Sequence, residues 1–140
     1  MATAIDTNII VALWDADFRL SSAAQLALDK ALERGTLVTT AVVFAELMAA
    51  PGRDEVFLDR FFRETGIQID WVLDESAWRT AGRAFRRYCA RRRKQREVGP
   101  RRLLADFLIG AHALEGGHSL LTLDSHLYRT SFPGLELARA

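Results

Sequence analysis

The chain has 140 residues, of which 49% are hydrophobic and 26% charged, and its formal net charge is +1. This size and composition indicate one globular domain over residues 1–140, with enough apolar residues for a substantial core. We expect no membrane-spanning helix, because no apolar run reaches the roughly 18 residues that cross a bilayer, and we find no pattern of a signal peptide. The single cysteine, Cys89, excludes an internal disulfide and fits a reducing cytoplasm.

Short strands and helices alternate along the chain. The first half of the chain is predicted to contain a strand at 3–5, a helix from after Asn8 to about 14, a helix capped by Ser21 or Ser22 and ending near 34, a strand at 36–39 and a helix capped by Thr40 and ending before 51. A helix at 54 to about 64, a strand at 68–72 and a long helix from after 74 to about 93 follow. The last predicted elements are a helix at 103 to about 115, a strand at 119–123, a short helix after 124 and an edge strand at 135–137. This alternation predicts an α/β fold, a three-layer α/β/α sandwich around a short, mostly parallel sheet.

Four acidic residues stand out because each lies alone in an uncharged, mostly apolar stretch: Asp6, Glu46, Asp106 and Asp124. Apolar stretches are usually buried, and an ionised carboxylate is costly to bury without a partner. Asp6 and Asp124 also follow predicted strands, where ligands collect in parallel sheets. We therefore expect all four to share one counter-charge, which a divalent cation would supply.

Ligands that are all oxygen favour Mg²⁺ or Mn²⁺ over Zn²⁺, and the chain has no His-x-x-x-His or Cys pair. Such an ion activates water for the hydrolysis of a phosphodiester, so the four acids are interpreted as catalytic metal ligands. Simpler roles stay open for three of them, because Asp6 and Asp124 can cap helices and Glu46 can pair with an arginine.

Polar residues next to the acids are expected to orient the ligands or a water through hydrogen bonds, although local turn or cap roles are equally consistent. These residues are Thr7, Asn8 and Thr122. The histidines are not assigned to the cluster: His112 is expected on a helix surface and His118 in a solvated, Gly-rich turn. Gly-rich nucleotide loops and a Gly-x-Ser-x-Gly elbow are absent.

Basic residues are concentrated in one segment. Ten of the 19 Lys and Arg residues lie between Arg83 and Arg102, where Glu97 is the only acid. Such a segment favours a polyanionic partner, since neutralised phosphates release counterions. The residues expected to bind RNA are Arg86, Arg87, Arg91, Arg92, Arg93, Lys94, Arg96, Arg101 and Arg102. A solvated helix face or a docking site for an acidic protein is the alternative.

The order of these motifs resembles that of PIN domains, over essentially the whole chain. The matching segments are Ile5-Asp6-Thr7-Asn8-Ile9, Ala45-Glu46-Leu47, residues 105–113 around Asp106, residues 121–124 ending in Asp124, and residues 128–135. Small PIN proteins of this kind are mostly VapC-type toxins. The resemblance therefore implies a Mg²⁺- or Mn²⁺-dependent endoribonuclease that holds its metal with the four acids. It also implies a homodimer and a cognate antitoxin whose tail blocks the active site, often with an arginine.

Two other functions remain open. A haloacid-dehalogenase-like phosphatase would use Asp6 as its nucleophile, but that class needs a second Asp two residues later, where this chain has Asn8. A non-catalytic RNA-binding or partner-binding module is the other alternative, although a binding surface has no need of buried carboxylates.

Overall fold

The computed structural model describes residues 2–96 and 102–139. One sheet contains the strands β1 (Thr3–Ile5), β2 (Leu37–Thr40), β3 (Gln68–Asp70) and β4 (Ser119–Leu121). The strand order is β3-β2-β1-β4, and every neighbouring pair is parallel. The chain therefore builds outward from β1 to β3 and then crosses back to place β4 on the other side of β1.

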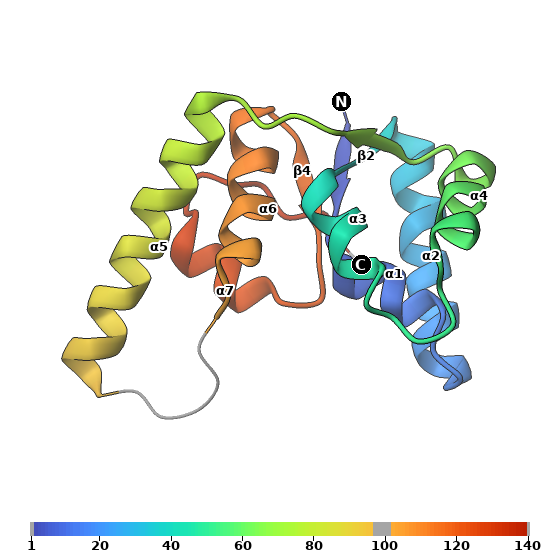
Figure 1. The fold of residues 1–140 in the computed structure, drawn as a ribbon, viewed down its shortest axis with the longest axis horizontal. Helices are drawn as coiled ribbons and strands as arrows, with labels where there is room; N and C mark the ends of the chain where they lie inside the picture. The colour runs from blue at the N-terminus through green and yellow to red at the C-terminus, as the bar shows by residue number, and fades with distance from the viewer. Residues whose placement is uncertain (1, 97–101, 140) are drawn as a thin grey trace.

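Helices cover both faces of this sheet. Those within the described residues are α1 (Thr7–Leu13), α2 (Phe18–Arg34), α3 (Ala41–Leu47), α4 (Glu55–Thr65), α5 (Glu75–Gln95), α6 (Leu104–Glu115) and α7 (Ser125–Ser131). Figure 1 shows α5, α6 and α7 to the left of the sheet and α1, α2 and α4 to the right. The prediction of a three-layer α/β/α sandwich is confirmed, and the described sheet is parallel throughout.

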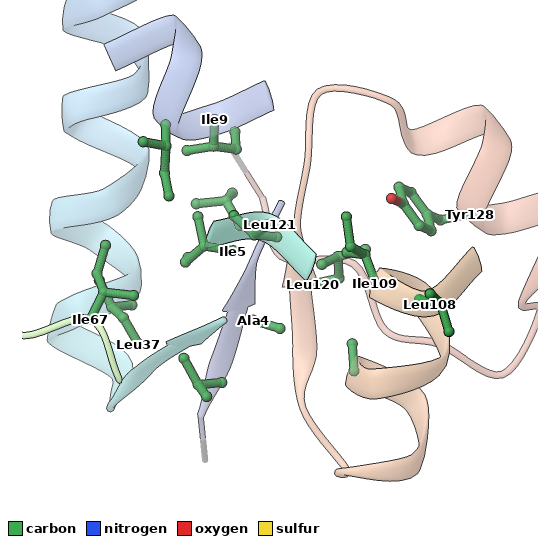
Figure 2. Packing of buried hydrophobic residues seen from close by; sticks show 14 of the residues in the cluster. Ala4, Ile5, Ile9, Leu37, Ile67, Leu108, Ile109, Leu120, Leu121 and Tyr128 are labelled. Carbon is green, nitrogen blue, oxygen red and sulfur yellow. The ribbon is translucent and has the colours of Figure 1, made fainter. Parts of the chain in front are cut away.

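The core lies on both sides of β1 because successive side chains of a strand point to opposite faces. Ile5 pairs with Leu121 and Ala4 with Leu120, and all four side chains are buried. Figure 2 shows Ile5 and Leu121 next to Ile9 of α1, whereas Leu120 lies beside α6. The strands β1, β2 and β4 are buried on both faces, which explains why their sequences do not alternate between apolar and charged residues.

Several predicted boundaries were wrong by a few residues. The second helix starts at Phe18, because Asp17 caps it by accepting the N–H of Arg19 at 2.9 Å, so Ser21 and Ser22 lie inside it. Strand β2 lies one residue later than predicted, whereas β3 and β4 each end two residues earlier. The predicted edge strand at 135–137 is a single bridge, between Leu120 and Leu137.

Helix α6 is buried around its whole circumference. Every residue from Phe107 to Ala113 is buried, because α6 packs between α5 and the sheet. The expectation that His112 lies on a helix surface was therefore wrong: its side chain is only 7% exposed. No helix in the described part of the chain has both the length and the apolar character needed to cross a membrane.

Two glycines test how tightly α6 is packed. A Cβ on Gly110 would lie 2.4 Å from the ring of Phe132, which is itself buried, whereas a Cβ on Gly82 of α5 would meet nothing within 4 Å. We expect Gly110→Ala to lower the free energy of unfolding by about 1–3 kcal/mol through overpacking. Gly82→Ala should instead raise it by about 0.5–1 kcal/mol through helix propensity. Urea unfolding measures both changes, and stabilisation by both variants would contradict the packing.

Candidate metal centre

Asp6 lies where the order of the sheet reverses. Its backbone N–H donates to the carbonyl of Leu121 at 3.0 Å, so the chain leaves β1 beside the end of β4. Its side chain is also the N-cap of α1, since Oδ1 accepts the N–H of Thr7 at 2.7 Å. The capping role that the sequence left open is therefore real, but it does not exclude ligand binding: in parallel sheets the crevice at such a reversal is the usual ligand site.

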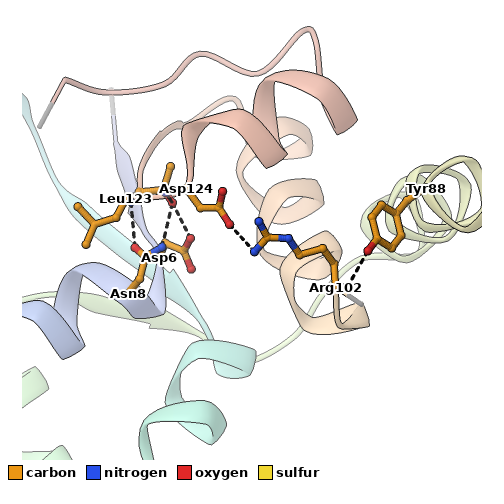
Figure 3. Close-up of polar contacts among 7 residues, drawn as sticks. Asp6, Asn8, Tyr88, Arg102, Leu123 and Asp124 are labelled. Carbon is orange, nitrogen blue, oxygen red and sulfur yellow. Dashed lines mark hydrogen bonds and ion pairs between the residues drawn. The ribbon is translucent and has the colours of Figure 1, made fainter. Parts of the chain in front are cut away.

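Thr122 joins the loops that follow β1 and β4. Its hydroxyl donates to Oδ2 of Asp6 at 2.7 Å and accepts from Nδ2 of Asn8 at 3.3 Å and the N–H of Asp124 at 3.0 Å. Asn8 completes the network, since its Oδ1 accepts the N–H of Leu123 at 3.1 Å (Figure 3). Every hydrogen-bonding position of the Thr122 hydroxyl is used, so this group fixes the direction of the Asp6 carboxylate.

Glu46 enters from α3, directly after β2. The Thr7 hydroxyl donates to Oε1 of Glu46 at 2.6 Å, which connects this carboxylate to the first turn of α1. Thr40 caps α3 through the N–H of Val42 and so sets where the helix begins. Among the described residues no arginine or lysine pairs with Glu46, so the alternative of a structural ion pair gains no support.

Asp106 lies in the first turn of α6 and is half-buried. Burial raises its pKa, and the negative charge of Glu46 adds to the rise, whereas Arg102 lowers it. Burial also raises the pKa of Asp6 to about 6, despite the hydrogen bonds that it accepts, and the charge of Asp106 contributes. The acids therefore interact electrostatically, although they come from different elements.

Arg102 gives Asp124 a counter-charge of its own. Nη1 of Arg102 lies 2.6 Å from Oδ2 of Asp124, and the backbone N–H of Arg102 donates to the Tyr88 hydroxyl at 2.8 Å (Figure 3). Asp124 occupies the N-cap position of α7 but makes no side-chain capping bond there. Arg102 was predicted as part of the RNA-binding segment, and its position beside the acids was not foreseen.

The four acids share one electrostatic environment but do not converge on a point. Within residues 2–96 and 102–139, no three of these acids bring one oxygen each within 4.8 Å of one another. Their ligand atoms are all carboxylate oxygens, and two of the acids have pKa values raised by burial and by neighbouring negative charge. This set of donors, with one arginine against four acids, fits a hard divalent cation.

Tyr128 belongs to this site although the sequence analysis did not select it. Its side chain is buried, its hydroxyl makes no hydrogen bond of normal geometry, and the nearby charges of Asp6 and Asp106 add to the effect of burial in raising its pKa. The only sequence signal is its position one helical turn after Asp124, which any structural tyrosine could share.

The rest of the predicted RNA-binding set lies mainly on α5, away from the acids. Arg86, Arg87 and Arg93 are exposed, as are Lys94 and Arg96. The remaining α5 members, Arg91 and Arg92, are half-buried. Arg101 lies outside the described residues. The structure therefore brings only one described member of the set, Arg102, to the acid cluster.

The raised pKa of Asp6 predicts how its neutralisation changes stability. A folded-state pKa of about 6, against 3.8 as the ordinary value, means that the folded chain binds this proton more tightly than the unfolded chain. The charge on Asp6 therefore costs stability as pH rises through this range. In EDTA at pH 7.5 we expect Asp6→Asn, which preserves the cap, to be more stable than the parent by up to about 3 kcal/mol.

Urea unfolding in EDTA at several pH values measures this difference, which should disappear below about pH 4. A less stable Asp6→Asn variant at pH 7.5 would show instead that the ionised carboxylate is held by a structural partner.

Comparison with known proteins identifies the family and the fold of the chain. The model of the PIN domain family matches residues 3–133. No curated protein matches the chain. Similar solved structures include VapBC2 from Rickettsia felis bound to a DNA fragment from their promoter, at 20% identity over 98% of this chain and 97% of that chain with a TM-score of 0.62.

Two further structures are comparable. VapBC-1 from nontypeable Haemophilus influenzae has 17% identity over 98% of this chain and 96% of that chain, with a TM-score of 0.63. A toxin-antitoxin complex from Klebsiella pneumoniae has 16% identity over 98% of both chains, with a TM-score of 0.57. At these identities the structures show a shared fold. Because the family model covers nearly the whole chain, the protein belongs to the PIN domain family.

Proposed function

We propose that this PIN domain is a Mg²⁺- or Mn²⁺-dependent endoribonuclease. The observation that supports it most is the buried carboxylate of Asp6 at the reversal of the sheet, which feels the charge of Asp106. Thr7 bonds to both Asp6 and Glu46, and Thr122 bonds to both Asp6 and the backbone of Asp124. A buried carboxylate that is linked to three half-buried acids is costly in a fold that binds no cation, whereas a hydrolase of phosphodiesters uses such an arrangement.

Each acid has a role in this proposal. Asp6, Glu46, Asp106 and Asp124 would hold the metal, which when bound supplies an activated water and offsets charge on the phosphate. Thr122 donates to one oxygen of Asp6, and each carboxylate oxygen keeps a further lone pair for a ligand. The threonine therefore limits the rotation of Asp6 without using its capacity to bind.

Arg102 and the basic face of α5 would bind the substrate. The Arg102 guanidinium already lies at the acids, so it is placed to contact the phosphate that is cut. The exposed side chains at the end of α5, among them Arg93, Lys94 and Arg96, would bind the RNA backbone farther from the scissile bond.

We further propose that the protein is a VapC-type toxin of a type II toxin–antitoxin pair that acts in the cytoplasm. Support comes from the match to the PIN family and from similar structures that include VapBC proteins and a toxin-antitoxin complex. Its partners would then be RNA, a cognate antitoxin and a second copy of the chain. An acidic antitoxin segment is the other possible occupant of the α5 face.

The phosphatase alternative is weakened by the contacts of Asn8. Both ends of its side-chain amide are engaged, with the Thr122 hydroxyl and with the N–H of Leu123. A residue held in this way connects two loops, and it cannot act as the second catalytic acid that such a phosphatase requires.

Neutralising the acids tests the nuclease. We expect the purified parent to cleave total RNA with Mg²⁺ or Mn²⁺ but not with EDTA, and we expect Asp6→Asn and Asp106→Asn to lower the rate at least ~100-fold. Asp59→Asn is the matched control, because Asp59 is an exposed acid of α4, and it should keep the parent rate. Equal cleavage by the parent and the Asp6 and Asp106 variants would refute the mechanism.

Removing charge from the end of α5 tests the substrate-binding role. The triple variant with Ala at Arg93, Lys94 and Arg96 should raise KM for RNA with little change in kcat. It should also reduce the salt dependence of RNA binding by roughly one unit of slope for each lost phosphate contact.

A triple variant of equal charge, with Ala at the exposed Lys30, Arg60 and Arg63, serves as the control for net charge. Indistinguishable KM values and salt slopes in the two triple variants would show that the α5 face does not bind RNA and would favour an acidic protein there.

A further inference from the structure

A second group of ligating side chains lies outside the acid cluster. It contains Asp70 at the end of β3, His112 in the last turn of α6 and His118 just before β4. One potential ligand atom from each lies within 4.8 Å of the other two. Nε2 of His112 lies 2.7 Å from Oδ2 of Asp70, and the two imidazole rings are 5.4 Å apart between centroids. Within the described residues, this is the one group of three or more such side chains that meets this distance limit.

His112 is not fully accounted for by packing and hydrogen bonding. Its imidazole is buried, and although Nε2 faces Asp70, Nδ1 is buried with no hydrogen-bond partner in the described structure. An ion shared with Asp70 would bind Nε2, the nitrogen that faces this carboxylate, so the observation that points to a metal is a buried imidazole with two ligating neighbours.

Gly116 supplies an independent observation at the same place. A Cβ at this position would lie 2.5 Å from Nε2 of His118, so this imidazole would have to shift if residue 116 carried a side chain. The backbone of Gly116 has φ of −79°, which any residue can adopt, so the reason for glycine here is space rather than conformation. The N–H of His118 donates to the carbonyl of Ala113 at 2.9 Å, which holds the residue against the end of α6.

The three donors suit a transition metal such as Zn²⁺ better than Mg²⁺. Two imidazole nitrogens and one carboxylate suit Zn²⁺, which commonly takes three protein ligands and a water, whereas Mg²⁺ prefers oxygen alone. Zinc–nitrogen bonds of about 2.0–2.1 Å place tetrahedral ligand atoms about 3.3 Å apart. Oδ2 of Asp70 would therefore have to move away from Nε2 of His112, which now lies 2.7 Å from it. Asp70 is exposed, so its side chain can make this adjustment without disturbing the core.

We propose that Asp70, His112 and His118 form a second metal site, which takes Zn²⁺ and is distinct from the acid cluster. His112 follows Asp106 by six residues, which places the two sites about 9 Å apart along α6. A bound ion would tie β3, an edge strand paired only with β2, to the end of α6 and to β4. The site would therefore stabilise the fold rather than take part in cleavage.

The test uses metal-stripped, full-length protein and Zn²⁺ alone as the probe. We expect one equivalent of Zn²⁺ to raise the Tm of the parent, and Co²⁺ in its place to give the intense visible bands of a four-coordinate site. His118→Gln should weaken Zn²⁺ binding at least tenfold, and Asp70→Asn should do the same, although asparagine can still hydrogen-bond to His112. Both residues are at least partly exposed, so the variants should fold.

Two controls separate this site from other metal-binding groups. His126→Gln replaces the remaining histidine, which is exposed, and should bind Zn²⁺ within twofold of the parent. The Asp6→Asn/Asp106→Asn variant should also keep the Zn²⁺-induced rise in Tm, whatever happens to its nuclease activity. The proposal is overturned if the parent shows no Zn²⁺-induced shift, if His118→Gln and the parent bind Zn²⁺ equally, or if neutralising Asp6 and Asp106 abolishes the binding.

Discussion

The burial of the Asp6 carboxylate between the ends of β1 and β4 is the constraint around which the rest of the site is arranged. A charged group in this position needs hydrogen bonds and a counter-charge, and the chain supplies the first through the N–H of Thr7 and the hydroxyl of Thr122. These bonds lower the pKa of Asp6 but do not cancel the effect of burial, which leaves it at about 6. The remaining imbalance is the physical reason for expecting a cation.

Arg102 supplies part of that counter-charge. Its guanidinium pairs with Asp124 and lowers the pKa of Asp106, so one of the four acids already has a cationic partner within the chain. An arginine at a metal-dependent phosphodiesterase centre is useful, because a phosphate can take the place of the carboxylate as its partner. Within the described residues, Asp6 and Glu46 have no arginine or lysine as a partner. These two carboxylates are therefore the ones that most need the charge of a bound metal.

The order of the elements could be predicted because β1, β2 and β4 are short, buried runs and because several helices begin at a capping residue. Asp6 and Thr40 illustrate this: Asp6 directly follows β1, Thr40 ends β2, and each caps the next helix. The burial of His112 was missed because the residue was judged on its own polarity. Helix α6 is apolar on all sides, and such a helix is enclosed on all sides, including its single histidine.

Contacts between distant segments could not be predicted from the sequence. Nothing in the local pattern shows that Arg102 reaches Asp124, that Tyr128 faces Asp6, or that Asp70 meets His112 across 42 positions of the chain. Such pairs depend on the packing of α5, α6 and α7 against the sheet, which periodicity does not encode. The four acids could be found because an isolated charge in an apolar run is a local signal in the sequence. The distances between them could not be predicted, because these depend on tertiary packing.

Direct binding of Mn²⁺, followed by electron paramagnetic resonance of the free ion, tests the central claim without relying on catalysis or on a substrate. A shared site predicts saturable binding by the parent that Mg²⁺ competes away, and at least tenfold weaker binding when either Asp6 or Glu46 is replaced by its amide. Binding that is absent from the parent, or unchanged by both replacements, would show that these carboxylates do not share a metal.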